Sequence, residues 1–394
     1  MSTKMHRRRL TTCIFVCRLS NIKTQKGRIF MKIAARGASL TSVRPTSLAG
    51  VGFGRIFSDR MFAMEYSPCL GWHDARIQPL QEISLHPACC VFHYGAEVFE
   101  GLKAYRRADG DISLFRVIDN GKRLASSCER MSLPVLDPQD FVEAVNSFVR
   151  AQTDWVPGEP GTSLYLRPFV ICTDTQLGVH GITNAAFYII ASPVGSYYPN
   201  GLAPVRIAIE RDDVRAVRGG TGYAKCGGNY AAAARATVRA EKAGYDQVLW
   251  LDGVERRYIE EVGAMNVMFK IGDRIVTPGL TGSILPGITR STCITLLREM
   301  GYEVEERQLD VAELIEAAES GALEEAWGCG TAAVISPIGV LRFGGEDHAV
   351  RGGGIGPVSQ ALYDAITGIQ YGRIADTHGW VTRLAPAQAF PCGA

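Results

Sequence analysis

Short apolar runs and segments of helical spacing follow one another along most of the chain. Alternating apolar and polar residues predict strands at 72–77, 88–95, 98–106, 112–116, 165–171 and 185–191. Helical spacing predicts helices at 120–128 and 137–151, the second with Pro138 in its first turn. We therefore expect an α/β domain over residues 47–193.

A second domain is predicted after a break at Gly195–Gly201, where Pro199 interrupts the periodicity. We place the linker at 194–203, the second domain at 204–385 and a tail at 386–394. Strands are expected at 204–209 and 247–251, hairpin strands at 257–261 and 266–271, and helices over 229–243, 286–300, 310–321 and 358–366. The apolar stretch 326–341 is interrupted at Gly330 and Pro337, which predicts buried strands around a turn.

Charge separates the first 58 residues from the rest. They hold twelve of the 42 Lys and Arg and no acidic residue, so 30 basic residues remain against all 40 Asp and Glu. The excess of acidic residues after residue 58 argues against nucleic-acid binding. No apolar run is long enough to predict a membrane span. Residues 1–46 resemble a mitochondrial or plastid presequence in composition, or else a poorly ordered extension. We expect a cytoplasmic protein, or an organellar one if this leader is a transit peptide.

Eleven cysteines occur without framework or C-x-x-C spacing. Reduced thiols in an intracellular compartment fit this pattern best. Cys89 and Cys90 lie near His93, but no second ligand pair follows at zinc spacing, so a buried strand is expected there and no metal site.

The segment Gly219–Tyr230 holds the most informative lysine. Lys225 lies between two glycine-rich turns and just before a segment of strong helix propensity. A lysine withdrawn from water has a lowered pKa and can form a Schiff base with a carbonyl compound such as pyridoxal phosphate. The other eight lysines lack this setting, since four lie in the leader and none of the remaining four lies between two glycine-rich turns.

Pyridoxal phosphate also needs an acidic residue next to its ring nitrogen and a binding site for its phosphate. Glu261 is a candidate acid, because it ends a predicted strand before Gly263. Leu285–Thr289 offers backbone N–H groups at a helix start, and Gly328–Ala333 adds a turn of small residues. Arg123 could complete the phosphate site. No P-loop, H-E-x-x-H or G-x-S-x-G motif is present.

Six ordered motifs and a C-terminal segment resemble those of the branched-chain amino acid aminotransferases, over roughly residues 50–385. They are His93–Gly95 with Phe99–Lys103, Tyr165–Pro168, Lys225–Tyr230, Glu261–Asn266, Leu285–Thr289, Gly330–Ala333 and, near the C-terminus, Ile369–Gly372 with His378–Trp380. The redox C-x-x-C of the mammalian members is absent, because Ala333 and Ser336 stand at its places.

The resemblance implies a fold-type IV pyridoxal-phosphate enzyme that works as a homodimer, with its site between two α/β domains. It implies that Lys225 is the catalytic residue and binds the cofactor covalently, and that Glu261 contacts the ring nitrogen and Tyr230 the phenolic oxygen. The phosphate would be held by Arg123, Ile288, Thr289 and Thr331.

The resemblance also implies a substrate site. Thr331 and Ala332 would receive the α-carboxylate, and Arg167 the distal carboxylate of glutamate. An apolar pocket would be lined by Phe53, Tyr94, Phe99 and Tyr165. The expected reaction is transfer of the amino group of leucine, isoleucine or valine to 2-oxoglutarate. Alternatives are a D-amino-acid aminotransferase or aminodeoxychorismate lyase on the same fold, a cofactor-free Schiff-base lyase or aldolase, and a noncatalytic sugar- or nucleotide-binding module.

Overall fold

The computed structural model describes residues 24–25, 28–29, 31–36, 44–45, 47–48, 52–195 and 202–385. The chain divides into two units, Met1–Lys32 and Ile33–Ala394. In the smaller unit, β1 (Thr24–Gln25) pairs antiparallel with β2 (Arg28–Ile29). The predicted tail and most of the predicted leader and linker lie outside the described residues, as does Gly201.

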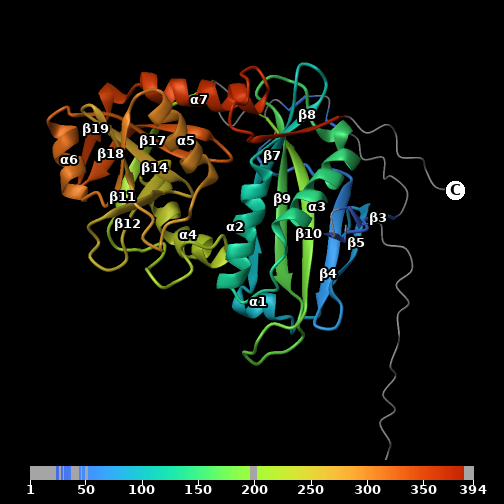
Figure 1. Ribbon diagram of the computed structural model, residues 1–394. Coiled ribbons are helices and arrows are strands. Elements are labelled where there is room, and N and C mark those ends of the chain that lie inside the picture. Colours follow the sequence, from blue (N-terminus) through green and yellow to red (C-terminus); the bar gives the residue numbers. More distant parts are fainter. Residues whose placement is uncertain are drawn as a thin grey trace, which may run out of the picture. The chain divides into compact units, whose positions relative to one another are not determined.

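Within the described part of the larger unit, the first of two sheets has nine strands (Figure 1). Its order is β20-β8-β7-β9-β10-β4-β5-β3, and β6 also pairs with β9. The strands are β3 (Ala34–Ala35), β4 (Arg60–Ser67), β5 (Gly71–Pro79), β6 (Glu97–Phe99), β7 (Leu102–Arg106), β8 (Ile112–Phe115), β9 (Ser163–Cys172), β10 (Ala185–Val194) and β20 (Val381–Leu384).

Two long helices pack beside this sheet, α2 (Val117–Arg130) and α3 (Pro138–Ala151), and η1 (Thr153–Trp155) follows them. The α3 helix begins where predicted, because Asp137 accepts a hydrogen bond from the Gln139 backbone N–H. The β20 strand pairs with β8, so residues 381–384 join the first sheet although they follow the second in sequence. The predicted domain boundaries stay predictions.

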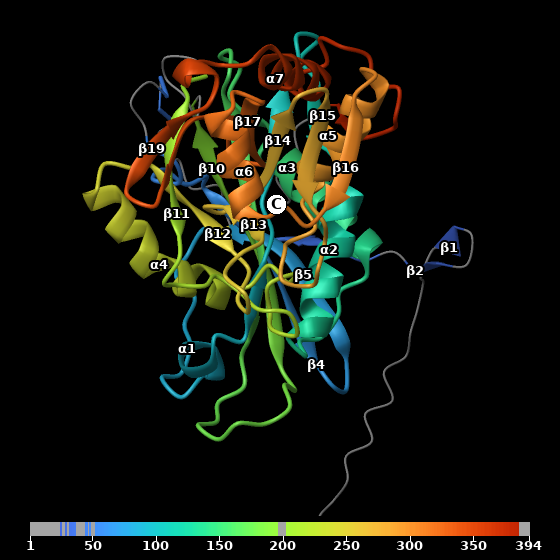
Figure 2. The same ribbon diagram turned by 90° about the vertical axis from the view of Figure 1, so that its left-hand side faces the viewer.

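The second sheet also has nine described strands, in the order β13-β12-β11-β18-β17-β14-β15-β16, with β19 paired to β18 (Figure 2). The strands are β11 (Val205–Glu210), β12 (Gln247–Leu251), β13 (Ile259–Val262), β14 (Asn266–Ile271), β15 (Arg274–Pro278), β16 (Glu303–Arg307), β17 (Leu323–Gly330), β18 (Val334–Phe343) and β19 (Glu346–Ala349). The helices of this half are α4 (Gly227–Lys242), α5 (Ile288–Glu299), α6 (Val311–Glu319) and α7 (Pro357–Gln370), with η2 (Arg351–Gly353) before α7.

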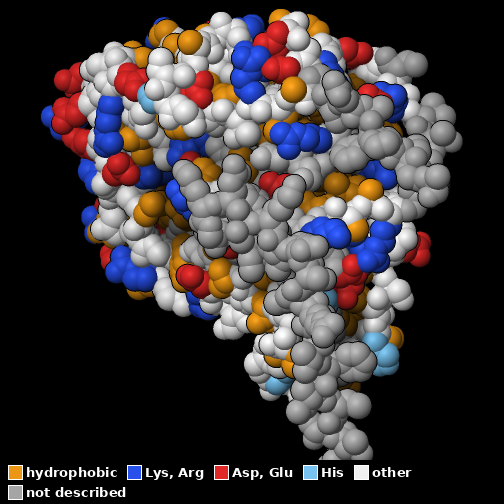
Figure 3. Space-filling model, turned by 45° about the vertical axis from the view of Figure 1, so that its right-hand side comes forward, with side chains coloured by type: hydrophobic (Ala, Val, Ile, Leu, Met, Phe, Trp, Pro, Cys, Tyr) orange, Lys and Arg blue, Asp and Glu red, His pale blue; other side chains and the backbone are white. Residues whose placement is uncertain are grey.

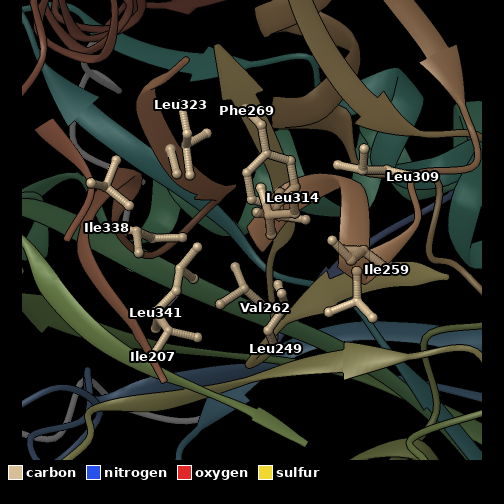
Figure 4. Close-up of a cluster of buried hydrophobic side chains, with 14 of the residues drawn as sticks. Ile207, Leu249, Ile259, Val262, Phe269, Leu309, Leu314, Leu323, Ile338 and Leu341 are labelled. Carbon is tan, nitrogen blue, oxygen red and sulfur yellow. The ribbon is translucent and has the colours of Figure 1, made fainter. Parts of the chain in front are cut away.

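Helices cover both faces of the second sheet. Along β14, Val267 and Phe269 belong to one buried cluster and Met268 to another, as strand alternation requires. The first cluster includes Leu314 of α6 together with Phe269, and both are labelled in the close-up of Figure 4. The second includes apolar residues of α5 and α7. These two buried clusters hold the strands of the second sheet in place, and predicted site residues lie at the ends of these strands.

The predicted strand at 88–95 is wrong. The chain forms the short helix α1 (Cys90–Tyr94) instead, which ends at Gly95 with a φ of 56°. The helix brings Cys90 to Cys172 on β9, and the two form a disulfide with a Cα–Cα distance of 6.3 Å. The expectation of reduced thiols is therefore wrong for this pair. Their separation of 82 residues hides the contact from an analysis of spacing.

The predicted strand at 98–106 divides into β6 and β7, with Glu100 and Gly101 between them. A side chain on Gly101 would collide with the Tyr165 hydroxyl, since a Cβ there would lie 2.2 Å from that oxygen. Both strands still pair with β9. The break turns the Glu100 carboxylate into the interior, where it meets charged groups of the site.

The mixed α/β fold class predicted from the sequence is confirmed. No helix among the described residues is long and apolar enough to cross a membrane. On the described part of the face drawn in Figure 3, Lys and Arg side chains are interspersed with Asp and Glu.

Candidate functional site

One cavity of about 260 Å³ brings together segments that are far apart in the sequence. The first sheet contributes through β6, β9 and α2, and the second through β13, α5 and the turn between β17 and β18. The predicted site residues that line it are Phe53, Phe99, Arg123, Tyr165, Arg167, Lys225, Tyr230, Glu261, Ile288, Thr289, Thr331 and Ala332. Tyr94 does not line it.

Backbone hydrogen bonds attach Lys225 to the first half of the site. Its N–H donates to the Ser127 hydroxyl at 3.0 Å, and its carbonyl accepts from the Phe99 N–H at 2.9 Å. The preceding loop is closed by Asn229, whose side-chain amide donates to the carbonyls of Thr221 and Ala224. The lysine is therefore delivered from a rigid loop rather than from a mobile one.

The amine of Lys225 is half-buried and donates a hydrogen bond to the Tyr230 hydroxyl at 2.7 Å. Burial, followed by the nearby charge of Arg123, lowers the pKa of Lys225 to about 8. Burial, followed by the charge of Glu261, raises the pKa of Tyr230 to about 12. Near neutral pH a useful fraction of Lys225 is thus an uncharged, nucleophilic amine beside a protonated phenol.

Glu261 is buried at the end of the cavity formed by β13. Its Oε1 accepts a hydrogen bond from the Leu285 N–H at 2.7 Å, and its Oε2 lies 3.3 Å from Nε of Arg215. Burial raises the pKa of Glu261, and the charge of Arg215 opposes that rise. The carboxylate can therefore accept a hydrogen bond from a protonated or proton-donating group of a ligand.

The start of α5 lies in the cavity wall and has an arrangement that could bind an anion. Its first residue is Ile288, and no side chain of the described residues caps its N-terminus. The free N–H groups and the helix dipole therefore face the cavity. At Gly287 a Cβ would lie 1.8 Å from Oδ1 of Asn266, so glycine is needed there. Arg116 supports the helix from behind, donating to the hydroxyls of Ser291 and Thr292.

Arg123 lies at the same end of the cavity and is held by Glu100. Its Nε and Nη2 donate to the two oxygens of Glu100 at 2.7 and 2.8 Å, while Nη1 donates to the Pro286 carbonyl at 3.3 Å. Glu100 is fully buried and also accepts a hydrogen bond from Asn120. A bidentate pair of this kind fixes the plane of the guanidinium. Arg123 is thus oriented toward the start of α5.

The turn between β17 and β18 carries Thr331 and Ala332. The buried amine of Lys103 on β7 donates to the Ala332 carbonyl at 2.7 Å. Since the carbonyl of Ala332 is held by Lys103, the orientation of this turn in the cavity wall is fixed. Burial lowers the pKa of Lys103 to about 8. A second lysine therefore supports the site from the first sheet.

Aromatic side chains and one arginine form the wall of the cavity that belongs to the first sheet. Phe53 packs edge-on against Tyr165 with 4.7 Å between ring centroids. The guanidinium of Arg167 lies over Phe99 at 4.7 Å and donates to the Tyr165 hydroxyl at 2.9 Å. Its Nε is buried and has no hydrogen-bond partner among the described residues. This wall can accept an aliphatic side chain and retains a cation at its edge.

Residues 97–340 match the protein family described as Amino-transferase class IV. The chain is 50% identical over 335 residues to branched-chain-amino-acid aminotransferase 2 of Bacillus subtilis (strain 168), an alignment that covers 85% of this chain and 92% of that protein. The chain belongs to the class IV aminotransferase family. The resemblance to branched-chain amino acid aminotransferases found in the motifs is thereby confirmed.

Two solved structures show the same fold. The branched-chain amino acid aminotransferase of Escherichia coli has a TM-score of 0.67 and 28% identity, covering 77% of this chain and 95% of that chain. The branched-chain amino acid aminotransferase of Thermobaculum terrenum in its PLP-form (holo-form) has a TM-score of 0.67 and 26% identity, covering 82% and 97%. The predicted fold type is therefore that of the class IV aminotransferases.

Tyr94 lies outside the cavity of its own chain. It ends α1, is 47% exposed, and donates a hydrogen bond through its hydroxyl to the Leu177 carbonyl. Leu177 belongs to the loop between β9 and β10, and Figure 1 shows this loop beside α1. The role of Tyr94 in the substrate pocket stays a prediction.

Three charged residues of this aminotransferase site were missed by reasoning from the sequence: Glu100, Lys103 and Arg215. Lys103 was passed over because no glycine flanks it, yet it interrupts the apolar run Leu102–Tyr105, which is a signal of a buried, paired charge. Glu100 stands in the motif quoted for the family but was given no role. Arg215 stands outside the quoted motifs, and no local pattern marks it.

Proposed function

We propose that the protein reversibly transfers the amino group of leucine, isoleucine or valine to 2-oxoglutarate, using pyridoxal 5'-phosphate. The observation that carries the proposal is a single cavity that holds Lys225 with a pKa lowered to about 8, the buried Glu261 and the uncapped start of α5. The relative in Bacillus subtilis that is 50% identical is a branched-chain-amino-acid aminotransferase by name, which supports this choice of substrate.

The chemistry of the cavity residues fits this cofactor. A nucleophilic amine, an acid and a cluster of free N–H groups at a helix start are what its aldehyde, ring nitrogen and phosphate require. Lys225 would hold the aldehyde carbon, Glu261 the ring nitrogen, and Tyr230 the phenolic oxygen. Arg123, Ile288, Thr289 and Thr331 would hold the phosphate. When bound, pyridoxal phosphate supplies a carbonyl for the amino group and a ring that withdraws electrons from the substrate Cα.

The protein side chains then have distinct tasks. Once the incoming amino group has displaced it, the amine of Lys225 would take the proton from the substrate Cα and pass it to the cofactor carbon that carries the transferred nitrogen, helped by its hydrogen bond to Tyr230. Glu261 would keep a proton on the ring nitrogen, so that the ring continues to withdraw electrons from the substrate Cα. The N–H groups of the Thr331–Ala332 turn receive the α-carboxylate, and Lys103 maintains the orientation of that turn.

One pocket has to accept both a branched aliphatic side chain and the acidic side chain of glutamate. Phe53, Phe99 and Tyr165 would enclose the aliphatic chain and exclude water. Arg167, whose Nε is free of hydrogen bonds to described residues, would bind the distal carboxylate of glutamate. When a branched aliphatic side chain is bound instead, the space next to Arg167 stays empty.

An activity panel tests the function. Purified protein is supplied with pyridoxal phosphate and assayed with leucine, D-alanine and aminodeoxychorismate, with 2-oxoglutarate as acceptor. We expect an absorbance band from bound cofactor that is lost in Lys225→Ala, and turnover with leucine above that with the other two. Faster turnover of D-alanine or aminodeoxychorismate would favour the alternatives on the same fold. A protein that gains no band would overturn the proposal.

We further propose that the enzyme is a homodimer in which Tyr94 of one copy approaches the cavity of the other. In support, four large apolar side chains are exposed together around α1 and the β9–β10 loop, namely Phe92, Tyr94, Leu177 and Val179, at 61%, 47%, 64% and 85%. Contact between α1 and this loop is made by the Tyr94 hydrogen bond and by the bridge between Cys89 and Thr175. An apolar surface of this kind is typical of an interface between proteins.

Light scattering tests the dimer. The unsubstituted protein is expected at twice the chain mass, and Val179→Asp at the chain mass, because a buried unpaired charge opposes association. Val254→Asp is the matched control, since Val254 is 82% exposed in a turn of the second half. A monomeric unsubstituted protein at assay concentration would rule out the dimer.

A further inference from the structure

Arg215 is a buried cation directly behind the acid of the site. It lies on the segment between β11 and α4, and its side chain is 8% exposed. Its Nη2 donates to the Ser283 carbonyl at 2.5 Å, and its Nε lies 3.3 Å from Oε2 of Glu261. This Nε makes no hydrogen bond with a described residue, so its contact with Glu261 is one of charge.

The carboxylate of Glu261 is held from both sides. Oε1 accepts from the Leu285 N–H at 2.7 Å and lies 3.5 Å from Nδ2 of Asn266, whereas Oε2 faces Arg215. The strand that carries Glu261 is anchored by Ile259 and Val262, which are buried in the cluster of Figure 4. Neither the backbone nor the carboxylate can therefore turn freely, and one edge of the group stays directed at the cavity.

Several other charged or titratable groups act on Glu261. Lys225 and Arg123 favour its ionised form from the cavity side, and the phenol of Tyr230 lies on the same side. Glu260, the next residue, is also buried and shares the influence of Arg215. Among the charges, that of Arg215 opposes most strongly the effect of burial on the pKa of Glu261. Arg215 is thus the counter-charge of this acid.

We propose that Arg215 is a positioning residue that keeps Glu261 ionised and oriented, so that a proton shared between Glu261 and the ring nitrogen of the cofactor resides on the nitrogen. The inference rests on the proposed function, because it assumes a pyridine ring against Glu261. A cation 3.3 Å from Oε2 stabilises the carboxylate more than it destabilises a pyridinium on the far side. Without it, burial favours the neutral acid and a neutral ring.

Nuclear magnetic resonance of the holoenzyme reports the position of the proton. Pyridoxal phosphate labelled with 15N at the ring is bound to the unsubstituted protein, Arg215→Lys, Arg215→Gln and Arg218→Gln. We expect a pyridinium shift in the unsubstituted protein, a move toward unprotonated pyridine in Arg215→Gln, and partial rescue in Arg215→Lys. Arg218→Gln is the matched control, because Arg218 is exposed three residues further along. An unchanged shift in Arg215→Gln overturns the proposal.

A second measurement does not use turnover. The affinity of the apoenzyme for pyridoxal phosphate is compared with its affinity for the 1-deaza analogue, in which carbon replaces the ring nitrogen. We expect the preference for the natural cofactor to fall about tenfold in Arg215→Gln, which corresponds to one pKa unit of differential stabilisation. In a Glu261→Gln background, replacing Arg215 should change the preference no further, since Arg215 acts through Glu261.

The outcomes separate this inference from the proposed function. If the unsubstituted protein fails to bind pyridoxal phosphate, the proposed function fails and this inference with it. If it binds the cofactor and transaminates leucine, yet the Arg215 variants keep both the ring shift and the preference, this inference alone fails. If Arg215→Gln does not fold, Arg215→Lys takes its place in both measurements. It keeps the buried charge but not the geometry of the guanidinium, so we expect the same changes with smaller size.

Discussion

The second half of the molecule presents backbone N–H groups to the cavity beside the side chains of Glu261 and Tyr230, whereas the first sheet presents chiefly long side chains. At the start of α5 and at the Thr331–Ala332 turn, the ligand would meet N–H groups whose positions depend on helix and hairpin geometry. On β6 and β9 it would meet Phe99, Tyr165 and Arg167. Under the proposed function, this difference would separate two tasks: main-chain N–H groups would bind the phosphate and the α-carboxylate, which every substrate complex has, and side chains would select the part of the substrate that varies.

Lys225 joins the two sides, since it directly precedes α4 of the second half in sequence and its backbone is hydrogen-bonded to α2 and β6 of the first half. Replacing it should therefore have the largest effect of all. We expect Lys225→Ala to lower kcat with leucine about a thousandfold, because proton transfer by a positioned base is lost. Lys242→Ala, an exposed position at the end of α4, serves as the control and should keep full activity. Residual activity above a tenth in Lys225→Ala would contradict the role given to this amine.

Arg167→Met tests whether the side chains contributed by the first sheet determine which substrates the cavity accepts. We expect kcat/KM for 2-oxoglutarate to fall about 10- to 100-fold, the value of a hydrogen bond to a charged group, while kcat/KM for leucine in the first half-reaction changes little. The comparison of the two half-reactions is the measurement. Equal losses for both substrates would mean that Arg167 acts on the fold of the wall, through its packing on Phe99, rather than on the distal carboxylate.

Gly287→Ala tests whether the backbone N–H groups at the start of α5 determine the affinity for the cofactor. The new Cβ would displace Asn266, whose side chain donates to the Leu285 carbonyl at 2.9 Å, and so would shift the start of α5. We expect about a tenfold rise in the dissociation constant for pyridoxal phosphate, or roughly 1.4 kcal/mol. In Gly228→Ala, at the start of α4, the Cβ meets nothing within 4 Å, so affinity should be unchanged. Equal affinities in the two variants would refute this division of tasks.

The pH dependence of cofactor attachment gives the smallest effect. Burial, followed by Arg123, lowers the pKa of Lys225 to about 8 in the protein without cofactor, and only the neutral amine attacks an aldehyde. Raising the pH from 7 to 8 should therefore accelerate attachment about fivefold, and raising it from 8 to 9 less than about twofold. An ordinary lysine, with its pKa near 10.5, would gain about tenfold at each step. Stopped-flow absorbance distinguishes the two profiles, with Lys225→Ala as the blank.

Local patterns were enough to find the parts of the site that depend on local structure. Lys225 is flanked by glycines and precedes a strong helix, and Ile288 follows Gly287 at a helix start; both features are properties of neighbouring residues. The roles of Tyr165 and Arg167 came from the order of the motifs. Residue spacing alone would not have selected them, because alternation along a strand says nothing about what lies opposite.

Long-range contacts could not be predicted in this way. Lys103 meets the Ala332 carbonyl across 229 residues of sequence, and Cys90 meets Cys172 across 82. Arg215 becomes significant only because its segment passes behind β13. The error at residues 88–95 has a different origin, since a short apolar run shows no clear period and does not distinguish a five-residue helix from a strand.

The amino-acid sequence by itself determined the alternation of strands and helices, the family and the amine on which the chemistry depends, because propensity, glycine placement and motif order are carried by adjacent residues. Only the tertiary structure decided the charge environment of that amine and of Glu261. A pKa depends on burial and on charges within a few ångströms, and these come from segments that folding brings together.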